Sequence, residues 1–147
     1  MLGMLRAEAA RHGVSIRADL ADNLSAVSAD RVQIQQVLMN LMLNGIEAMS
    51  DTGGVLTVKS EMTTEGRIQI SVIDTGPGLP PDEVSRIFDA FFTTKPQGSG
   101  MGLSISKSIV ESHEGRIWAR SDDGRGAAFS FTLPALPTPS EISNVAE

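Results

Sequence analysis

Apolar and polar residues alternate in short stretches of the chain, and this spacing predicts strands with one buried face. The clearest example is "VSIRADL" at 14–20. Strand-like runs at 55–62 and 67–74, joined by "TTEG", predict a hairpin. The segments 115–122 and 126–134 predict a second hairpin around "DGRG". The sheet is therefore expected to combine a single strand with two hairpins.

Helical spacing of apolar residues fills the intervals between these strands. Gly13 is a predicted helix stop, Asp30 is a predicted N-cap, and Pro80 or Pro81 is expected to open a short helix. The predicted helices cover 2–12, 31–49, 80 or 81 to 88, and 101–112. Helices and strands mixed in this way indicate an α+β sandwich.

The long helix at 31–49 carries a polar stripe that ordinary solvent exposure explains poorly. At about 100° per residue, one side collects Gln36, Asn40, Asn44 and Glu47. The opposite side collects Ile34, Val37, Leu38, Leu41, Met42 and Ala48. A solvated face would use better helix formers than asparagine, and the flanking positions are the apolar Met39, Leu43 and Ile46. We therefore favour a binding site over a solvated face.

Two glycine loops follow. In "DTGPGL", Asp74 stands at a predicted strand end, and Gly76 and Gly78 permit unusual backbone conformations and close approach of a ligand. Taken alone, this loop is typical of an ordinary turn. "GSGMGL" at 98–103 opens a helix, whose free N–H groups can bind an anion, and Lys95 precedes it. The second loop matches neither the dinucleotide fingerprint nor the P-loop.

Composition narrows the functional classes. The chain has 147 residues, 18 acidic and 12 basic, a formal net charge of −6 and no cysteine. It has no basic block, so nucleic acid is not an expected partner. It also has no apolar run of membrane-spanning length and no signal-peptide pattern, so membrane contact by this domain is not expected. The predicted folded domain covers 1–134, and 135–147 is predicted to be a disordered tail or linker.

The order of the motifs resembles the ATP-binding catalytic domain of bacterial sensor histidine kinases over residues 1–134. "QQVLMNLMLNGIEAM" is similar to the asparagine box of that family, "DTGPGL" to its first glycine box, "IFDAFFTTK" to its phenylalanine box and "GSGMGLSISKSIVESHEG" to its second glycine box. The resemblance implies a two-layer α/β sandwich of the Bergerat ATP-binding type. In it, a mixed sheet of about five strands packs against three helices, with ATP and Mg²⁺ bound beneath a lid.

The resemblance also implies residue roles. Asp74 would accept a hydrogen bond from the adenine amino group, with Gly76 and Gly78 bordering the base. Asn44 would bind Mg²⁺, Asn40 would lie beside the phosphates, and Lys95 would approach the γ-phosphate. A mobile lid is expected at 93–100, and the nucleotide-binding residues of the second glycine box are expected to be Gly98, Ser99, Gly100, Met101, Gly102 and Leu103. The sequence departs from the family pattern at Gly45, Glu47 and Glu114, where alanine, lysine and glycine are common. For Glu47, metal binding and pairing with Lys95 both stay open.

By the same resemblance, the chain is a protein histidine kinase domain that donates the γ-phosphoryl group of ATP to a histidine. The acceptor is expected on a separate dimerisation domain, with a response regulator as the further partner in a cytoplasmic two-component system. Neither His12 nor His113 suits the acceptor role. The domain by itself is expected to be a monomer, excised from a longer sensor.

Three other functions share this ATP site. They are an ATPase conformational switch of the gyrase, chaperone and mismatch-repair type, an anti-sigma-type serine kinase, and a nucleotide-binding module without catalysis. The ATPases typically carry a water-activating glutamate four residues before the metal-binding asparagine, at the position of Asn40 here. An asparagine in place of that glutamate favours a kinase over an ATPase switch.

Overall fold

The computed structural model of the chain describes residues 2–20, 31–84, 86–89, 102–121 and 126–134. The elements in chain order are α1 (Leu2–Arg11), β1 (Val14–Leu20), α2 (Arg31–Ala48), β2 (Gly54–Met62), β3 (Arg67–Ile73), α3 (Pro81–Val84), α4 (Gly102–Ser112), β4 (Arg116–Ser121) and β5 (Ala127–Pro134). The predicted N-cap Asp30, the predicted lid at 93–100 and the predicted tail at 135–147 lie outside the described residues.

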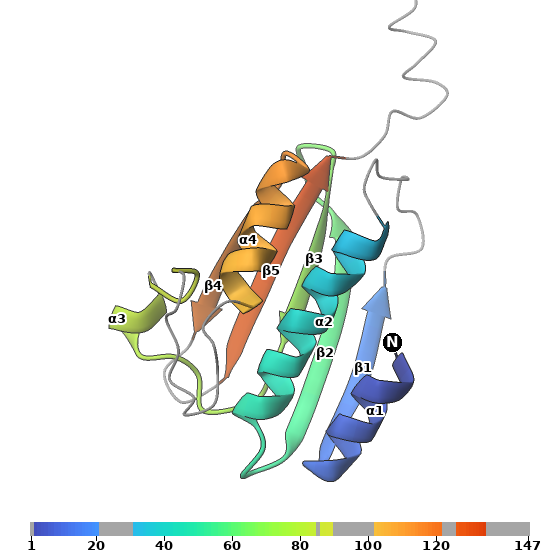
Figure 1. Cartoon of the computed structure of the whole chain (residues 1–147), viewed down its shortest axis with the longest axis vertical. Coiled ribbons are helices and arrows are strands. Elements are labelled where there is room, and N and C mark those ends of the chain that lie inside the picture. The colour runs from blue at the N-terminus through green and yellow to red at the C-terminus, as the bar shows by residue number, and fades with distance from the viewer. Residues whose placement is uncertain (1, 21–30, 85, 90–101, 122–125, 135–147) are drawn as a thin grey trace, which may run out of the picture.

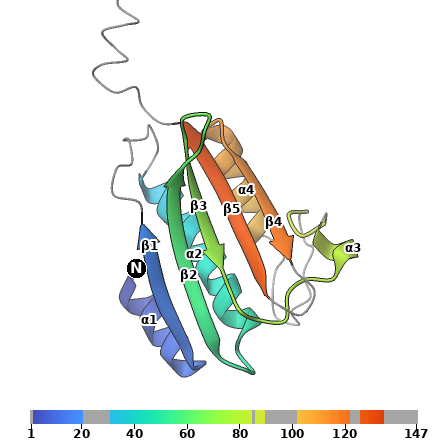
Figure 2. The same ribbon diagram turned by 180° about the vertical axis from the view of Figure 1, so that it is seen from behind.

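The molecule has two layers. The five strands form one sheet in the order β1-β2-β3-β5-β4, in which β1 and β2 are parallel and the other pairs are antiparallel. Helices α1, α2 and α4 lie on one face of this sheet (Figure 1). Figure 2 shows the opposite face, which no helix of the described ranges covers. The predicted α+β sandwich with a mixed five-stranded sheet and three helices on it is confirmed.

The parallel pair explains why α2 crosses the sheet. Two parallel neighbours cannot be joined by a tight hairpin, so the chain between β1 and β2 must return along the face of the sheet. Helix α2 forms this return and thereby acquires one side that faces the strands. The predicted polar stripe is left on the other side.

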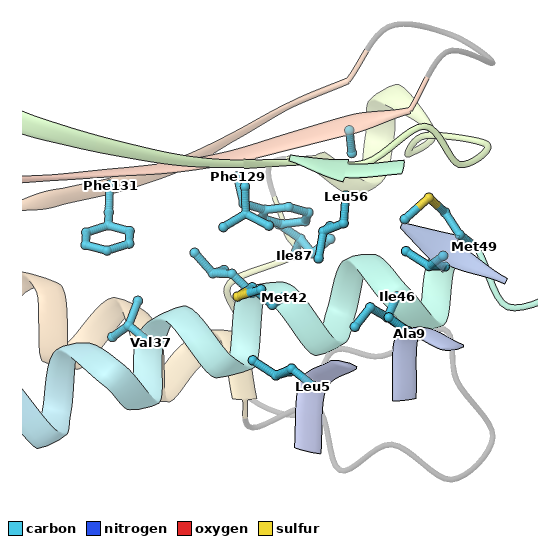
Figure 3. Close-up of a cluster of buried hydrophobic side chains, with 14 of the residues drawn as sticks. Leu5, Ala9, Val37, Met42, Ile46, Met49, Leu56, Ile87, Phe129 and Phe131 are labelled. Carbon is cyan, nitrogen blue, oxygen red and sulfur yellow. The ribbon is translucent and has the colours of Figure 1, made fainter. Parts of the chain in front are cut away.

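The core lies between the sheet and the helices (Figure 3). Its fully buried members come from both layers: Leu5, Val37, Leu41, Ile46, Met49, Leu56, Phe129 and Phe131. The rings of Phe88 and Phe129 meet edge to face, with 6.3 Å between their centroids. Phe88 therefore packs against the core.

The burial of α2 differs from the prediction at two positions. Ala48, placed on the apolar side by helical spacing, is exposed, and Ile46, placed beside the polar stripe, is completely buried. The reason is that α1 packs along α2, so α2 buries the flank that carries Ile46 as well as the side that faces the sheet. Figure 3 shows Leu5 and Ala9 of α1 on this flank. The helix predicted to reach Phe88 is also shorter: α3 ends at Val84, and 86–89 form a turn.

Helix α4 ends in a conformation that suits glycine better than the glutamate present. Glu114 has φ = +61°, the left-handed region. The Gly115 N–H donates to the Val110 carbonyl at 2.9 Å and the Glu114 N–H to the Glu111 carbonyl at 3.0 Å, which is the Schellman pattern. The Arg67 guanidinium donates to the Glu114 carbonyl. These backbone contacts hold a residue with a Cβ in a strained region.

We therefore expect Glu114→Gly to raise the free energy of unfolding by about 0.5–1 kcal/mol, because glycine adopts positive φ without the clash of a Cβ. Urea denaturation would measure the change. Glu114→Ala is the matched control: it removes the same carboxylate, keeps the Cβ and should gain little. Equal gains in both variants would assign the effect to charge and contradict the backbone explanation.

Candidate functional site

Asp74 directly follows β3, and its carboxylate is anchored at the end of the sheet. Its Oδ1 accepts hydrogen bonds from the Gly76 N–H at 2.9 Å and from the Ala127 N–H at 3.2 Å. Its backbone N–H donates to the Ala127 carbonyl at 2.9 Å. The residue is only 3% exposed. Because both donors bind the same oxygen, Oδ2 is the atom left to face a ligand.

Burial also sets the electrostatics of this group. Desolvation raises the pKa of Asp74 above its ordinary value, and the hydrogen bonds from Gly76 and Ala127 oppose that rise in part. A buried carboxylate with a raised pKa at a strand end is typical of a functional site rather than of a structural contact.

Glycines line the surroundings of this carboxylate. A Cβ built on Gly45 of α2 would lie 3.9 Å from Asp74 Oδ2 and 2.5 Å from Leu56 Cδ1. A Cβ on Gly76 would lie 3.2 Å from Asp74 Oδ1 and 3.2 Å from the Ala48 carbonyl. Gly76 therefore lets the loop after β3 approach Asp74 and the end of α2 closely. At Gly45 a Cβ would meet Asp74 at ordinary contact distance and would clash only with the side chain of Leu56.

Hydrogen bonds through Ser121 connect the remainder of the first glycine loop to the end of β4 and the start of β5. Gly78 has φ = +82°. The Leu79 N–H donates to Ser121 Oγ at 2.7 Å, and that hydroxyl donates to the Gly126 carbonyl at 3.2 Å. Ser121 therefore fixes the far end of the loop. The sequence analysis missed this residue, because a serine at a strand end carries no pattern of its own.

The second part of the site joins α2 to the first turn of α4. Asn40 Nδ2 donates to the Gly102 carbonyl at 3.3 Å and to Ser106 Oγ at 3.2 Å. Ser106 is fully buried. Among the predicted site residues, Asn40 and Gly102 are therefore brought together. Leu103 follows Gly102 directly in the chain. Ser106 was not predicted, although its place four residues after Gly102 puts both on one face of the helix.

Helix α2 connects the two parts. Gly45 lies beside Asp74, and Asn40 contacts Gly102. Positions 40 and 45 are five residues apart on the helix, a rise of about 7.5 Å. Asn44, half-buried, lies one turn from Asn40 on the same stripe, whereas Glu47 is exposed. The other predicted site residues lie outside the described ranges: Lys95, Gly98, Ser99, Gly100 and Met101.

Two features are absent from the described ranges. His, Asp and Glu side chains there do not gather into a group of three that could hold a metal ion. None of the helices there is long and apolar enough to cross a membrane.

Comparison with known proteins identifies the arrangement. Residues 29–137 match the family described as histidine kinase-, DNA gyrase B-, and HSP90-like ATPase. The chain belongs to this family. Within it, the similar curated proteins include the sensor protein FixL of Bradyrhizobium diazoefficiens, 47% identical over 130 residues, and the sensor histidine kinase TmoS of Ectopseudomonas mendocina, 43% identical over 136 residues. This ATPase-family chain is thus a catalytic domain of the sensor histidine kinase type.

Solved structures agree with this assignment. The catalytic domain of histidine kinase ThkA superposes with a TM-score of 0.76 at 36% identity, and covers 90% of this chain and 86% of its own. Full-length ShkA in complex with AMPPNP gives a TM-score of 0.78 at 31% identity over 92% of this chain. The match to this chain covers only 26% of the length of FixL, 14% of TmoS and 30% of the ShkA chain.

Proposed function

We propose that this domain, predicted to span residues 1–134, binds Mg-ATP and donates the γ-phosphoryl group to a histidine on a separate dimerisation domain. That domain would then pass the group to a response regulator. The observation that carries the proposal is the buried, oriented carboxylate of Asp74 beside the helix that bears Asn40 and Asn44. The AMPPNP complex of the similar ShkA supports ATP as the nucleotide.

Asp74 suits adenine. Its Oδ1 already accepts two backbone N–H groups, so Oδ2 is the atom available to accept from the exocyclic amino group of the base. Guanine presents a carbonyl oxygen at the corresponding position, and two acceptors repel each other. Gly76 and Gly78 leave the flat faces of the base unobstructed.

The donor set at α2 fits Mg²⁺. Magnesium prefers oxygen ligands and keeps few protein groups beside phosphates and waters, and the amide oxygen of Asn44 is such a ligand. When bound, the ion would neutralise charge on the phosphates during transfer. The residues of this chain hold and orient the nucleotide. Phosphoryl transfer is mainly positioning and charge stabilisation, so such a domain needs no covalent chemistry of its own.

The side chain of Asn40 favours transfer to a protein acceptor over hydrolysis. Its amide is no base, and its NH₂ group is directed at Gly102 and Ser106 of α4. No carboxylate therefore stands at this position to activate water. We place the domain in the cytoplasm, where ATP and response regulators are found, and expect it to be a monomer in isolation.

A transfer assay tests the proposal. The chain, γ-labelled ATP and Mg²⁺ should place acid-labile label on a matching histidine-bearing hairpin domain, and negligible label on the chain itself. Asn44→Ala should reduce the rate by at least about tenfold, because a transition-state charge contact is lost. Gln36→Ala, at an exposed position on the same stripe, is the matched control and should be near wild type.

Two results would contradict the proposal. Acid-stable label on a protein serine would favour the serine kinase. Phosphate release that is fast without any acceptor would favour the ATPase switch.

A further inference from the structure

Ser106 lies on α4, and its hydroxyl group points into the protein interior. It is completely buried, and its neighbours one turn further along the helix are the buried Ile109 and Val110. Buried hydroxyls are generally hydrogen-bonded, and Ser106 has two partners. Its Oγ donates to the Gly102 carbonyl at 2.9 Å and accepts from Asn40 Nδ2 at 3.2 Å. Gly102, Ser106 and Asn40 therefore form a closed three-way network between α4 and α2.

The chemistry of this network allows only one orientation of the Asn40 amide. The Gly102 carbonyl can only accept, so the branch of the amide that faces it must be the NH₂ group. The single proton of Ser106 is used on Gly102, so its hydroxyl can only accept from Asn40. The NH₂ side of the amide thus points at α4, where Gly102 and Ser106 both accept from it. The amide is planar, so its oxygen points away from Gly102 and Ser106.

We propose that Ser106 is a positioning residue for Asn40. It holds the amide so that Oδ1, an acceptor, faces the nucleotide site. This inference rests on the proposed Mg-ATP function. An oxygen turned toward phosphate oxygens is repelled unless a cation or a proton donor lies between them. Asn40 therefore acts toward Mg²⁺ or a water bound to it, and does not donate to a phosphate.

A positioning role of Ser106 and a purely structural one have different consequences for nucleotide binding. If Ser106 only packed α4 against α2, its loss would weaken nucleotide binding equally with and without metal. If it orients Asn40, its loss frees the amide to rotate, and only the metal-dependent part of the affinity falls.

Calorimetry of ATP binding with Mg²⁺ and with EDTA tests this. In Ser106→Ala we expect Mg-ATP affinity to fall about three- to tenfold, the range of one hydrogen bond. Metal-free affinity should change less than about twofold. The control is Ser112→Ala on the same helix, which loses a similar bond to the Ile109 carbonyl at 2.6 Å without touching α2. Ser106→Cys preserves the side-chain volume, should show the same selective loss in weaker form, and guards against misfolding of the alanine variant.

A double-mutant cycle completes the test. In an Asn40→Ala background, Ser106→Ala should have no further effect on the ratio of the two affinities, because the amide it positions is gone. NMR of the nucleotide-free protein gives a second readout: in Ser106→Ala the side-chain amide protons of Asn40 should exchange faster with solvent.

Equal loss with and without Mg²⁺, no loss at all, or additivity in the cycle would overturn the role of Ser106. Failure of the wild-type chain to bind Mg-ATP would instead overturn the proposed function.

Discussion

Replacing Asp74 with asparagine is expected to weaken ADP binding about 100-fold, the scale of a hydrogen bond to a charged group together with the repulsion that replaces it. The backbone N–H groups of Gly76 and Ala127 require an acceptor, so the amide oxygen of the variant must occupy the Oδ1 position. The NH₂ group then takes the Oδ2 position and confronts the adenine amino group, donor against donor.

The same substitution should relax the choice of base. An NH₂ group at the Oδ2 position can donate to the carbonyl oxygen of guanine, so the ratio of ADP to GDP affinity should fall in Asp74→Asn. Calorimetry with both nucleotides measures it. Asp51→Asn, which removes one carboxylate from an exposed turn, is the control and should leave both affinities unchanged. Unchanged ADP affinity in Asp74→Asn would rule out the adenine contact.

Asp74→Asn should weaken ADP binding but stabilise the nucleotide-free protein at neutral pH. Because burial raises the pKa of Asp74, its carboxyl group favours folding at pH below its ordinary value of 3.8. That contribution is lost as the pH rises through the raised pKa. An asparagine does not titrate. The nucleotide-free variant should therefore gain stability relative to wild type as the pH rises from the acidic range to neutrality. Thermal melts across this range would show it, and a gain confined to low pH would contradict the sign.

Gly126→Ala is expected to be the most destabilising of these substitutions, lowering the free energy of unfolding by at least about 3 kcal/mol. Gly126 has φ = +95°, and a Cβ there would lie 2.2 Å from the Asp74 carbonyl oxygen and 3.1 Å from the Cα of Thr75. These are backbone atoms that cannot rotate away. Relief of the clash requires β5 to separate from the end of β3, which also breaks the bonds that orient Asp74.

Gly66→Ala is the matched control, because Gly66 has φ = +76° and no atom within 4 Å of a built Cβ. It should lose only the left-handed backbone preference, about 1 kcal/mol. Denaturation of both variants in urea separates the two contributions. Equal losses would show that the backbone conformation, and not the contact with Asp74, makes position 126 sensitive.

Local patterns in the sequence were sufficient to predict the elements. The strand at 14–20 has the predicted bounds, and β2, β3, β4 and β5 lie within one or two residues of theirs. Alternation and helical spacing of apolar residues indicate which residues face a core, and this signal is contained within each segment. The order of four motifs predicted the family and thereby the two-layer fold. The strand pattern also placed Asp74 at the end of a strand, whereas its expected role in binding adenine came from the resemblance to the family.

The tertiary structure alone decided the contacts between distant segments. Ile46 is buried because α1 packs beside α2, and no spacing within α2 indicates that neighbour. Asp74 and Ala127 are 53 residues apart in the chain, and Asn40 and Ser106 are 66 apart. A side chain has no orientation until its partners are in place. The sequence by itself predicted which residues bind a nucleotide, and the packing of α2 against α4 and β3 decided which atoms those residues present.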